Sequence, residues 1–261
     1  MKMTPEQHRQ AALDLARAEL EAKAIAQLAT TWPGMDLDDA YAVQREVIAM
    51  RMAQGAKLRG HKVGLTSKTM QRSAGIDEPD YGHLLDDMFR ADGDTLQAAR
   101  FIVPRIEVEL AFVLGRPLAG PGVTLFDVLR ATEFVTPALE LIDGRSHYPR
   151  TIVDNVADNA ACGAVILGNR AFGPTEVDLR WVGAMLYKNA QVEETGLAAG
   201  VLGNPALGVV WLANRLATFG TTLEAGHVVL AGSFTRPVPV AAGDAIHADF
   251  GPLGSVACRF V

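Results

Sequence analysis

The segment 105–114 constrains the fold of this chain more than any other part of the sequence. It spells RIEVELAFVL, in which every even-numbered residue is apolar and two of the odd-numbered residues are Glu107 and Glu109. A period of two is that of a β-strand, so the apolar side must face a core while both glutamates share the opposite side. Their positions would lie about 6.6 Å apart along the strand. At that separation the charges repel by about 2–3 kcal/mol for an effective dielectric constant near 20, so we expect a positive charge between them.

A third carboxylate, Glu140, lies inside the apolar run 135–142. A charge in such a strand costs free energy unless it is paired or coordinates a cation. Three carboxylates without a suitably spaced histidine or cysteine pair favour a hard divalent ion, Mg²⁺ or Mn²⁺. The alternative is that Glu107 and Glu109 form a solvated strand face and Glu140 pairs with Arg145. Spacing alone does not decide between the two.

Lys62 is flanked by glycines within GHKVGL, residues 60–65, which has the pattern of a strand. Glycine lets a ligand approach the backbone closely, and a lysine partly desolvated beside a site could release its proton for acid–base chemistry. The alternative is an edge-strand lysine that only discourages aggregation. Asp80, in the acidic loop expected over 76–87, is a second acid–base candidate, although aspartate near glycine is common in simple turns.

A short segment near the C-terminus, GSFTRP over 232–237, is suited to holding an anion. Ser233 and Thr235 offer hydroxyls and Arg236 offers a guanidinium, so together they could bind a carboxylate. The segment is not a nucleophile elbow, because the G-x-S-x-G spacing is missing. The glycines at 196, 200 and 203 lack the strand-to-helix context that a dinucleotide fingerprint requires.

Helical signals dominate the start of the chain. A capping box at Thr4, with proline after it, predicts a helix that runs to Ala29. Asp36 and Gly55 predict the ends of a second helix. Much later, a proline near the start and a glycine at the end predict a long helix over 204–220.

From Leu58 onward the chain consists mainly of short strand-like runs divided by glycine. We expect strands at 58–65, 106–114, 136–142, 165–167, 179–187, 227–230, 245–250 and 255–261. The predicted fold class is therefore α+β, with an N-terminal helical region, 1–57, and a β-rich catalytic domain, 58–261, in one structural unit.

The composition limits the kinds of partner. The chain has 261 residues, of which 49% are hydrophobic and 21% charged, and its net charge is −6 without a basic cluster. A nucleic-acid partner is therefore not expected. No apolar run approaches the roughly 18 residues of a membrane span, and the N-terminus lacks the apolar core of a signal peptide, so we expect a cytoplasmic protein. Cys162 and Cys258 are far apart, which predicts buried free thiols.

Several stretches of the chain together resemble a known family. They are GHKVGLTSKTMQ (60–71), DEPDYGHLLDDMF (77–89), FIVPRIEVELAFVL (101–114), ALELID (138–143), AGSFTRPVP (231–239) and GSVACRFV (254–261). By these motifs, over nearly its whole length, the chain is similar to the 2-oxo-hept-4-ene-1,7-dioate hydratases of the fumarylacetoacetate hydrolase superfamily. The resemblance implies a mixed β-roll with N-terminal helices and assembly into homo-oligomers, such as pentamers paired into decamers.

The resemblance also implies residue roles. It makes Glu107, Glu109 and Glu140 the ligands of Mg²⁺ or Mn²⁺, and Lys62 and Asp80 the residues that move protons. These implied roles agree with the interpretation of the three carboxylates as a cation site.

The implied reaction adds water at C4 of an unsaturated 2-oxo dicarboxylate, during the breakdown of an aromatic compound by meta-cleavage. A metal would stabilise the charge that develops on the 2-oxygen, while Arg236 or Arg145 would hold the far carboxylate. The segment 144–150 is shorter than the corresponding loop of close relatives, which affects the expected length of the substrate.

Other functions are open to a chain of this family. A 2-oxo-3-hexenedioate (4-oxalocrotonate) decarboxylase shares the scaffold, but residues 233–236 favour the hydratase over it. A 2-hydroxypentadienoate hydratase is a further alternative. A non-catalytic, metal-dependent partner subunit would need no acid–base pair, so Lys62 and Asp80 argue against it.

Overall fold

Thirteen strands and seven α-helices form the described part of the chain, residues 2–261 of this computed structural model. The strands are β1 (Leu58–Gly64), β2 (Asp80–Leu85), β3 (Phe89–Arg90), β4 (Thr95–Leu96), β5 (Arg105–Leu114), β6 (Thr132–Ile142), β7 (Cys162–Leu167), β8 (Gly183–Lys188), β9 (Gln191–Leu197), β10 (Val228–Leu230), β11 (Val238–Pro239), β12 (Ala245–Asp249) and β13 (Ser255–Phe260). The helices are α1 (Pro5–Glu21), α2 (Leu28–Thr31), α3 (Leu37–Ala53), α4 (Lys68–Ala74), α5 (Leu125–Ala131), α6 (Ile152–Ala157) and α7 (Ala206–Ala217).

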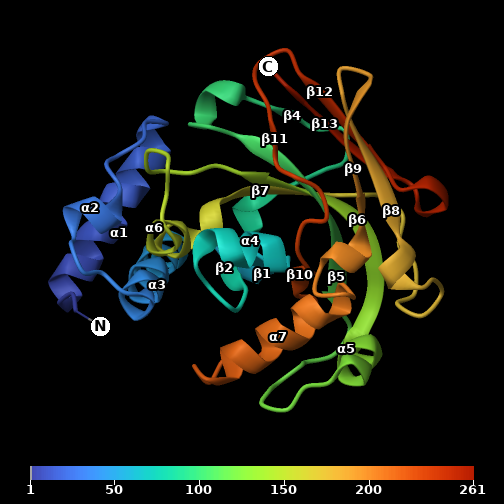
Figure 1. The fold of residues 1–261 in the computed structure, drawn as a ribbon, viewed down its shortest axis with the longest axis horizontal. Coiled ribbons are helices and arrows are strands. Elements are labelled where there is room, and N and C mark those ends of the chain that lie inside the picture. Colours follow the sequence, from blue (N-terminus) through green and yellow to red (C-terminus); the bar gives the residue numbers. More distant parts are fainter. Residues whose placement is uncertain (1) are drawn as a thin grey trace.

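The strand predicted from the alternating pattern is β5, and it lies in the larger of two sheets. This sheet has the order β2-β1-β10-β5-β6-β7-β3, and β11 also pairs with β5 (Figure 1). The pairs β1–β10 and β3–β7 are parallel, whereas β5 is antiparallel to β6 and β10, so the sheet is mixed. Ile106, Val108 and Leu110 are fully buried, as the alternation predicted.

A smaller sheet of five strands has the order β4-β13-β12-β8-β9. Its strand β13 contacts β6 and β7, which places it against the larger sheet. Helix α7 contacts β1, and Gly208 permits a close approach, because a Cβ there would overlap the carbonyl oxygen of Ala231. Helices and a mixed sheet thus share one core, which confirms the α+β class.

The N-terminal helices form one side of the molecule, next to α6 (Figure 1). The capping box at Thr4 is present, and α3 follows the predicted cap at Asp36. The prediction of one helix to Ala29 is wrong, because Ala22 adopts a left-handed conformation and ends α1. The chain then forms an isolated bridge from Ile25 to Ser146, so tertiary pairing overrides the helical composition there.

Two further predictions require correction. The loop expected over 76–87 is wrong, because residues from Asp80 onward form β2, which pairs with β1 and buries Tyr81 and Leu84. The acidic flanks of this segment concealed its short apolar centre. The strand expected from Leu179 begins only at Gly183, after a 3₁₀ turn, and its partner β9 was not predicted.

The hydrophobic core is continuous from the N-terminal helices to the sheets. Leu15 and Val43 from α1 and α3 belong to the same buried cluster as Val108 and Phe112 from β5. We therefore propose that the segments 1–57 and 58–261 form one structural unit. Among residues 2–261 no helix has both the length and the apolar character that a membrane crossing requires.

A buried network of charges fixes the chain between β6 and β7. Asp158 is 4% exposed, and its carboxylate accepts hydrogen bonds from the Arg145 amide at 2.8 Å and the Arg150 guanidinium at 2.7 Å. The Arg145 guanidinium, also buried, donates to the carbonyl oxygens of Asp143 and Cys162 at 3.0 and 2.9 Å. This network ties both ends of the connection together.

Asp158→Asn should lower the free energy of unfolding by about 3–5 kcal/mol, because it leaves two buried guanidinium groups without their shared counter-charge. Urea denaturation measures this change. The matched control is Asp178→Asn, which removes a carboxylate from an exposed pair with Arg180 and should change stability by less than about 1 kcal/mol. Equal effects of the two variants would contradict the structural role of Asp158.

Candidate active site

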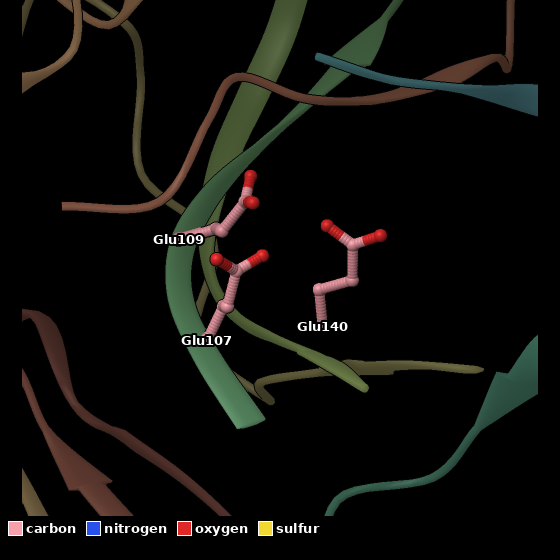
Figure 2. Close-up of side chains that lie close together, drawn as sticks. All are labelled: Glu107, Glu109 and Glu140. Carbon is pink, nitrogen blue, oxygen red and sulfur yellow. The ribbon is translucent and has the colours of Figure 1, made fainter. Parts of the chain in front are cut away.

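Three glutamates meet on one face of the larger sheet. Glu107 on β5 lies directly opposite Glu140 on the antiparallel strand β6, and Glu109 follows on the same side of β5. An oxygen of each carboxylate lies within 4.8 Å of an oxygen of the other two. Figure 2 shows the three side chains pointing toward one another from the two strands. The predicted proximity of these residues is therefore present.

Two of the three carboxylates are buried, Glu107 is half-buried, and the cluster is largely without hydrogen-bond donors. Glu109 and Glu140 are 1% and 0% exposed. The Glu109 Oε2 atom accepts a bond from the Gly232 amide at 2.8 Å, but Glu109 Oε1 and both oxygens of Glu140 have no hydrogen-bond partner in the described chain. Buried acceptors in this number are costly unless a cation binds them. An all-oxygen donor set of this kind suits a hard divalent ion.

Burial dominates the protonation of the cluster. It raises the pKa of all three glutamates, and the neighbouring Glu140 adds to this effect at Glu107, whose pKa rises to about 7. Lys62 partly offsets the rise at each of them. Protons therefore compete with a cation for these oxygens.

Lys62 lies beside the cluster on β1, where it is 4% exposed. Its Nζ atom is 3.4 Å from Glu140 Oε1 and donates to the carbonyl oxygen of Ala160 at 3.2 Å. Burial alone would lower the pKa of Lys62, but Glu140 and Asp80 outweigh it and hold that pKa above its usual value. This direction is opposite to the one that desolvation alone would give, and the acid–base role of Lys62 stays a prediction.

Asp80 faces the same space from the first residue of β2. Its Oδ2 atom accepts a hydrogen bond from Asn155 Nδ2 at 2.7 Å, whereas its buried Oδ1 has no partner in the structure's described residues. Gly64 lies opposite Asp80 in the β1–β2 register. A Cβ at Gly64 would overlap Asp80 Oδ1 and lie 3.2 Å from Lys62 Nζ. The glycine therefore leaves the space in which the acid and the amine meet.

Two supporting groups were missed by the sequence analysis. Asn155 on α6 holds Asp80, and the Ala160 carbonyl holds Lys62. Residues 159–161 all have positive φ, which is unusual outside glycine. The Asn159 side chain bonds both the amide and the carbonyl of His83, at 2.7 and 2.9 Å, and so anchors this turn to β2. Only the asparagine at 159, a residue tolerant of the left-handed region, could have signalled the turn.

The segment after β10 runs beside β5 and contacts it at Val108, between Glu107 and Glu109. Ser233 Oγ lies 3.4 Å from the Val108 carbonyl oxygen and donates to the Thr235 carbonyl oxygen at 3.0 Å. Thr235 Oγ1 accepts from the Val108 amide at 3.4 Å. The hydroxyls of Ser233 and Thr235 are thus engaged with backbone groups, and they position the Gly232 amide on Glu109.

The structure does not bring the two predicted anchor arginines to the glutamates. Arg236 has a side chain that is 84% exposed and pairs with Glu194 on β9 at 2.6 Å. The guanidinium of Arg145 is engaged in the buried network with Asp158. Glu140 pairs with Lys62 rather than with Arg145. The alternative of a Glu140–Arg145 pair is therefore wrong.

Comparison with known proteins agrees with the motifs in the sequence. Residues 56–261 match the fumarylacetoacetate (FAA) hydrolase C-terminal family. The chain is 56% identical over 254 residues to the 2-oxo-hept-4-ene-1,7-dioate hydratase of Escherichia coli, covering 95% of each chain. It is 39% identical to the 4-oxalocrotonate decarboxylase of Pseudomonas sp. (strain CF600), covering 95% of this chain and 94% of that one.

A solved structure is similar over the whole chain. It is the 4-oxalocrotonate decarboxylase from Pseudomonas putida G7 complexed with magnesium and adipate, which superposes with a TM-score of 0.97 at 39% identity. The superposition covers 100% of this chain and 99% of that one. Sequence, topology and fold therefore agree, and the chain belongs to the fumarylacetoacetate hydrolase family.

Proposed function

We propose that this protein is a metal-dependent hydratase, a hydro-lyase of meta-cleavage catabolism of homoprotocatechuate-type aromatic compounds. Its substrate would be 2-oxo-hept-4-ene-1,7-dioate or a close analogue, and its product 4-hydroxy-2-oxoheptane-1,7-dioate. The observation that carries this proposal is the 56% identity to a hydratase of this name over 95% of both chains, against 39% to decarboxylases. The buried site is compatible with this chemistry.

Glu107, Glu109 and Glu140 would hold Mg²⁺ or Mn²⁺. The oxygens of Glu109 and Glu140 that lack a hydrogen-bond partner, and the all-carboxylate composition of the cluster, support this assignment, and the similar decarboxylase structure is a magnesium complex. When bound, such a cation stabilises negative charge that develops on the 2-oxygen of a 2-oxo acid.

Lys62 and Asp80 would move the protons of the reaction. Conjugation of the double bond with the ketone removes a proton from C3 and adds one at C5, and water then adds at C4. Asp80 Oδ1 is suited to accept a proton, because it is buried and has no donor among residues 2–261. Lys62 is placed to donate one, because its Nζ atom lies beside Glu140 and a Cβ at Gly64 would lie close to both this amine and Asp80 Oδ1. Asn155 and the Ala160 carbonyl would orient these two groups.

Three other functions would use the same site and would give different experimental results. A decarboxylase would form the same stabilised enolate by loss of CO₂, and the fold similarity to such an enzyme makes it the second candidate. A 2-hydroxypentadienoate hydratase would lack a requirement for the far carboxylate. A non-catalytic partner subunit would bind the metal without turnover.

Assembly into a homo-oligomer is part of the proposal, as is a cytoplasmic location. Trp181 and Phe126 are 70% and 69% exposed, and such large exposed side chains suit burial between subunits.

The reaction is tested with 2-oxohept-4-ene-1,7-dioate and Mg²⁺ in H₂¹⁸O. We expect the product to gain one water with the label in the C4 hydroxyl, located by fragment masses, because the 2-oxo oxygen exchanges with solvent by itself. No CO₂ should be released. Release of CO₂ as the main product would favour the decarboxylase, and metal binding without turnover would favour the partner subunit.

The control for this experiment is Lys62→Met, which keeps the aliphatic length and removes the ammonium. Its kcat should fall by about 10²–10⁴-fold, while Mg²⁺ binding persists. An unchanged kcat with a raised KM would assign Lys62 to substrate binding instead.

The affinity of the site for Mg²⁺ should decrease as the pH falls. Because the pKa of Glu107 is raised to about 7 in the metal-free site, the folded protein keeps a proton there that the unfolded chain loses at lower pH. The contribution of this group to metal-free stability therefore falls as pH rises toward 7. Mg²⁺ must displace this proton and any held by Glu109 and Glu140, whose pKa values are also raised, so its apparent affinity should fall by at least about tenfold per pH unit below that value.

Thermal unfolding with Mg²⁺ or with chelator at pH 6, 7 and 8 measures this effect. The increase in Tm on adding Mg²⁺ should be larger at pH 8 than at pH 6, and Glu140→Gln should abolish it at every pH. Taking the difference at each pH removes the contribution of buried His61 and His83, whose lowered pKa values act in the opposite direction. An increment that is independent of pH, or that survives in Glu140→Gln, would contradict the assignment of the ligands.

A further inference from the structure

Arg105 is a cation on the glutamate face of β5 that no role described above uses. Residues 105, 107 and 109 are every second residue of β5, so Arg105 lies on the same side of the strand as Glu107 and Glu109. It lies opposite Ile142 in the β5–β6 register, two residues along each strand from the pair formed by Glu107 and Glu140. The arginine therefore stands at the end of the row of metal-site residues.

The charge of Arg105 is left without a carboxylate partner. None of the ion pairs within the described residues includes it, and its Nε atom is buried without a hydrogen-bond acceptor. A buried, unpartnered guanidinium N–H is costly and needs an acceptor.

The segment 144–150 holds this guanidinium in place. The Arg105 Cζ atom lies 4.9 Å from the centroid of the Tyr148 ring, and the Arg150 Cζ atom lies 5.8 Å from it. Arg150 is already paired with Asp158, so Arg105 is the one of these two without an anion. Stacking on an aromatic ring orients a guanidinium and leaves its edge free for a carboxylate.

We propose that Arg105 binds the far carboxylate of the dicarboxylate substrate, with Tyr148 orienting it. This inference rests on the proposed function and names its specificity determinant. Two strand positions span about 6.6–7 Å, which is of the order of the length of an extended seven-carbon dicarboxylate. A substrate whose 2-oxo acid end lies at the glutamates would thus present its other end to Arg105. The short segment 144–150, which carries Tyr148, would then set the length of the substrate.

Binding is measured first with two compounds that cannot be hydrated, 2-oxoheptanedioate and 2-oxoheptanoate, by calorimetry with Mg²⁺ present. They differ only in the far carboxylate. Wild-type protein should prefer the dicarboxylate, and Arg105→Met should weaken its binding by about 10- to 150-fold, the value of hydrogen bonds to a charged group. Binding of the monocarboxylate should change by less than about threefold.

Turnover of 2-oxohept-4-ene-1,7-dioate and of 2-hydroxypenta-2,4-dienoate gives the second readout. Arg105→Met should lower kcat/KM for the first by a similar factor and leave the second nearly unchanged. Arg236→Met is compared in parallel, and Arg130→Met, which removes a 74% exposed arginine on α5, controls for the loss of one positive charge. The Mg²⁺-dependent rise in Tm verifies that each variant retains its fold and site.

The outcomes separate this inference from the proposed function. Equal losses for mono- and dicarboxylates in Arg105→Met, or a selective loss in Arg236→Met instead, would overturn the role of Arg105. If the protein binds the dicarboxylate selectively through Arg105 but hydrates neither of the two unsaturated compounds, the role of Arg105 would be supported and the proposed hydratase function would be rejected.

Discussion

The mutual repulsion of three closely placed carboxylates, two of them buried, is the constraint on which the rest of this structure depends. The antiparallel register of β5 and β6 sets Glu107 against Glu140, and the period of the strand brings Glu109 to the same side. Their oxygens lie within 4.8 Å of one another, and most of those of Glu109 and Glu140 have no donor in the described chain. Such an arrangement is stable only with protons or a cation between the carboxylates. Burial and, after it, the neighbouring carboxylates raise the pKa values of these glutamates, and the proposed chemistry uses the same cluster.

The surroundings of the cluster preserve it and add acid–base groups. Lys62 supplies a positive charge from β1, and Gly64 leaves room for Asp80 beside it. Behind them, the left-handed turn 159–161 directs the Ala160 carbonyl to the lysine, and Asn155 bonds the aspartate. A turn that costs conformational energy is retained where the surrounding contacts determine it, as is common at functional sites.

Local patterns predicted the parts of the site that lie on regular strands. The alternation in β5 and the isolated acid of β6 singled out the three glutamates as candidates, the resemblance supplied their role, and the pairing of β5 with β6 brings them together. The failures involve long-range contacts. Nothing local indicated that Asp158 would engage Arg145, that Glu194 would pair with Arg236, or that β2 would pair with β1. The partner of a charged side chain, whether buried or exposed, is often distant in sequence, and a periodicity does not report it.

The central claim is that Glu107, Glu109 and Glu140 together bind one divalent cation. Anomalous diffraction from crystals grown with Mn²⁺, recorded near the manganese absorption edge, tests it without relying on turnover. We predict one strong peak with an oxygen of each of the three glutamates about 2.0–2.2 Å from it, at the short distances of octahedral divalent sites. A cluster without a peak at saturating Mn²⁺, or manganese bound only elsewhere on the chain, would contradict the account.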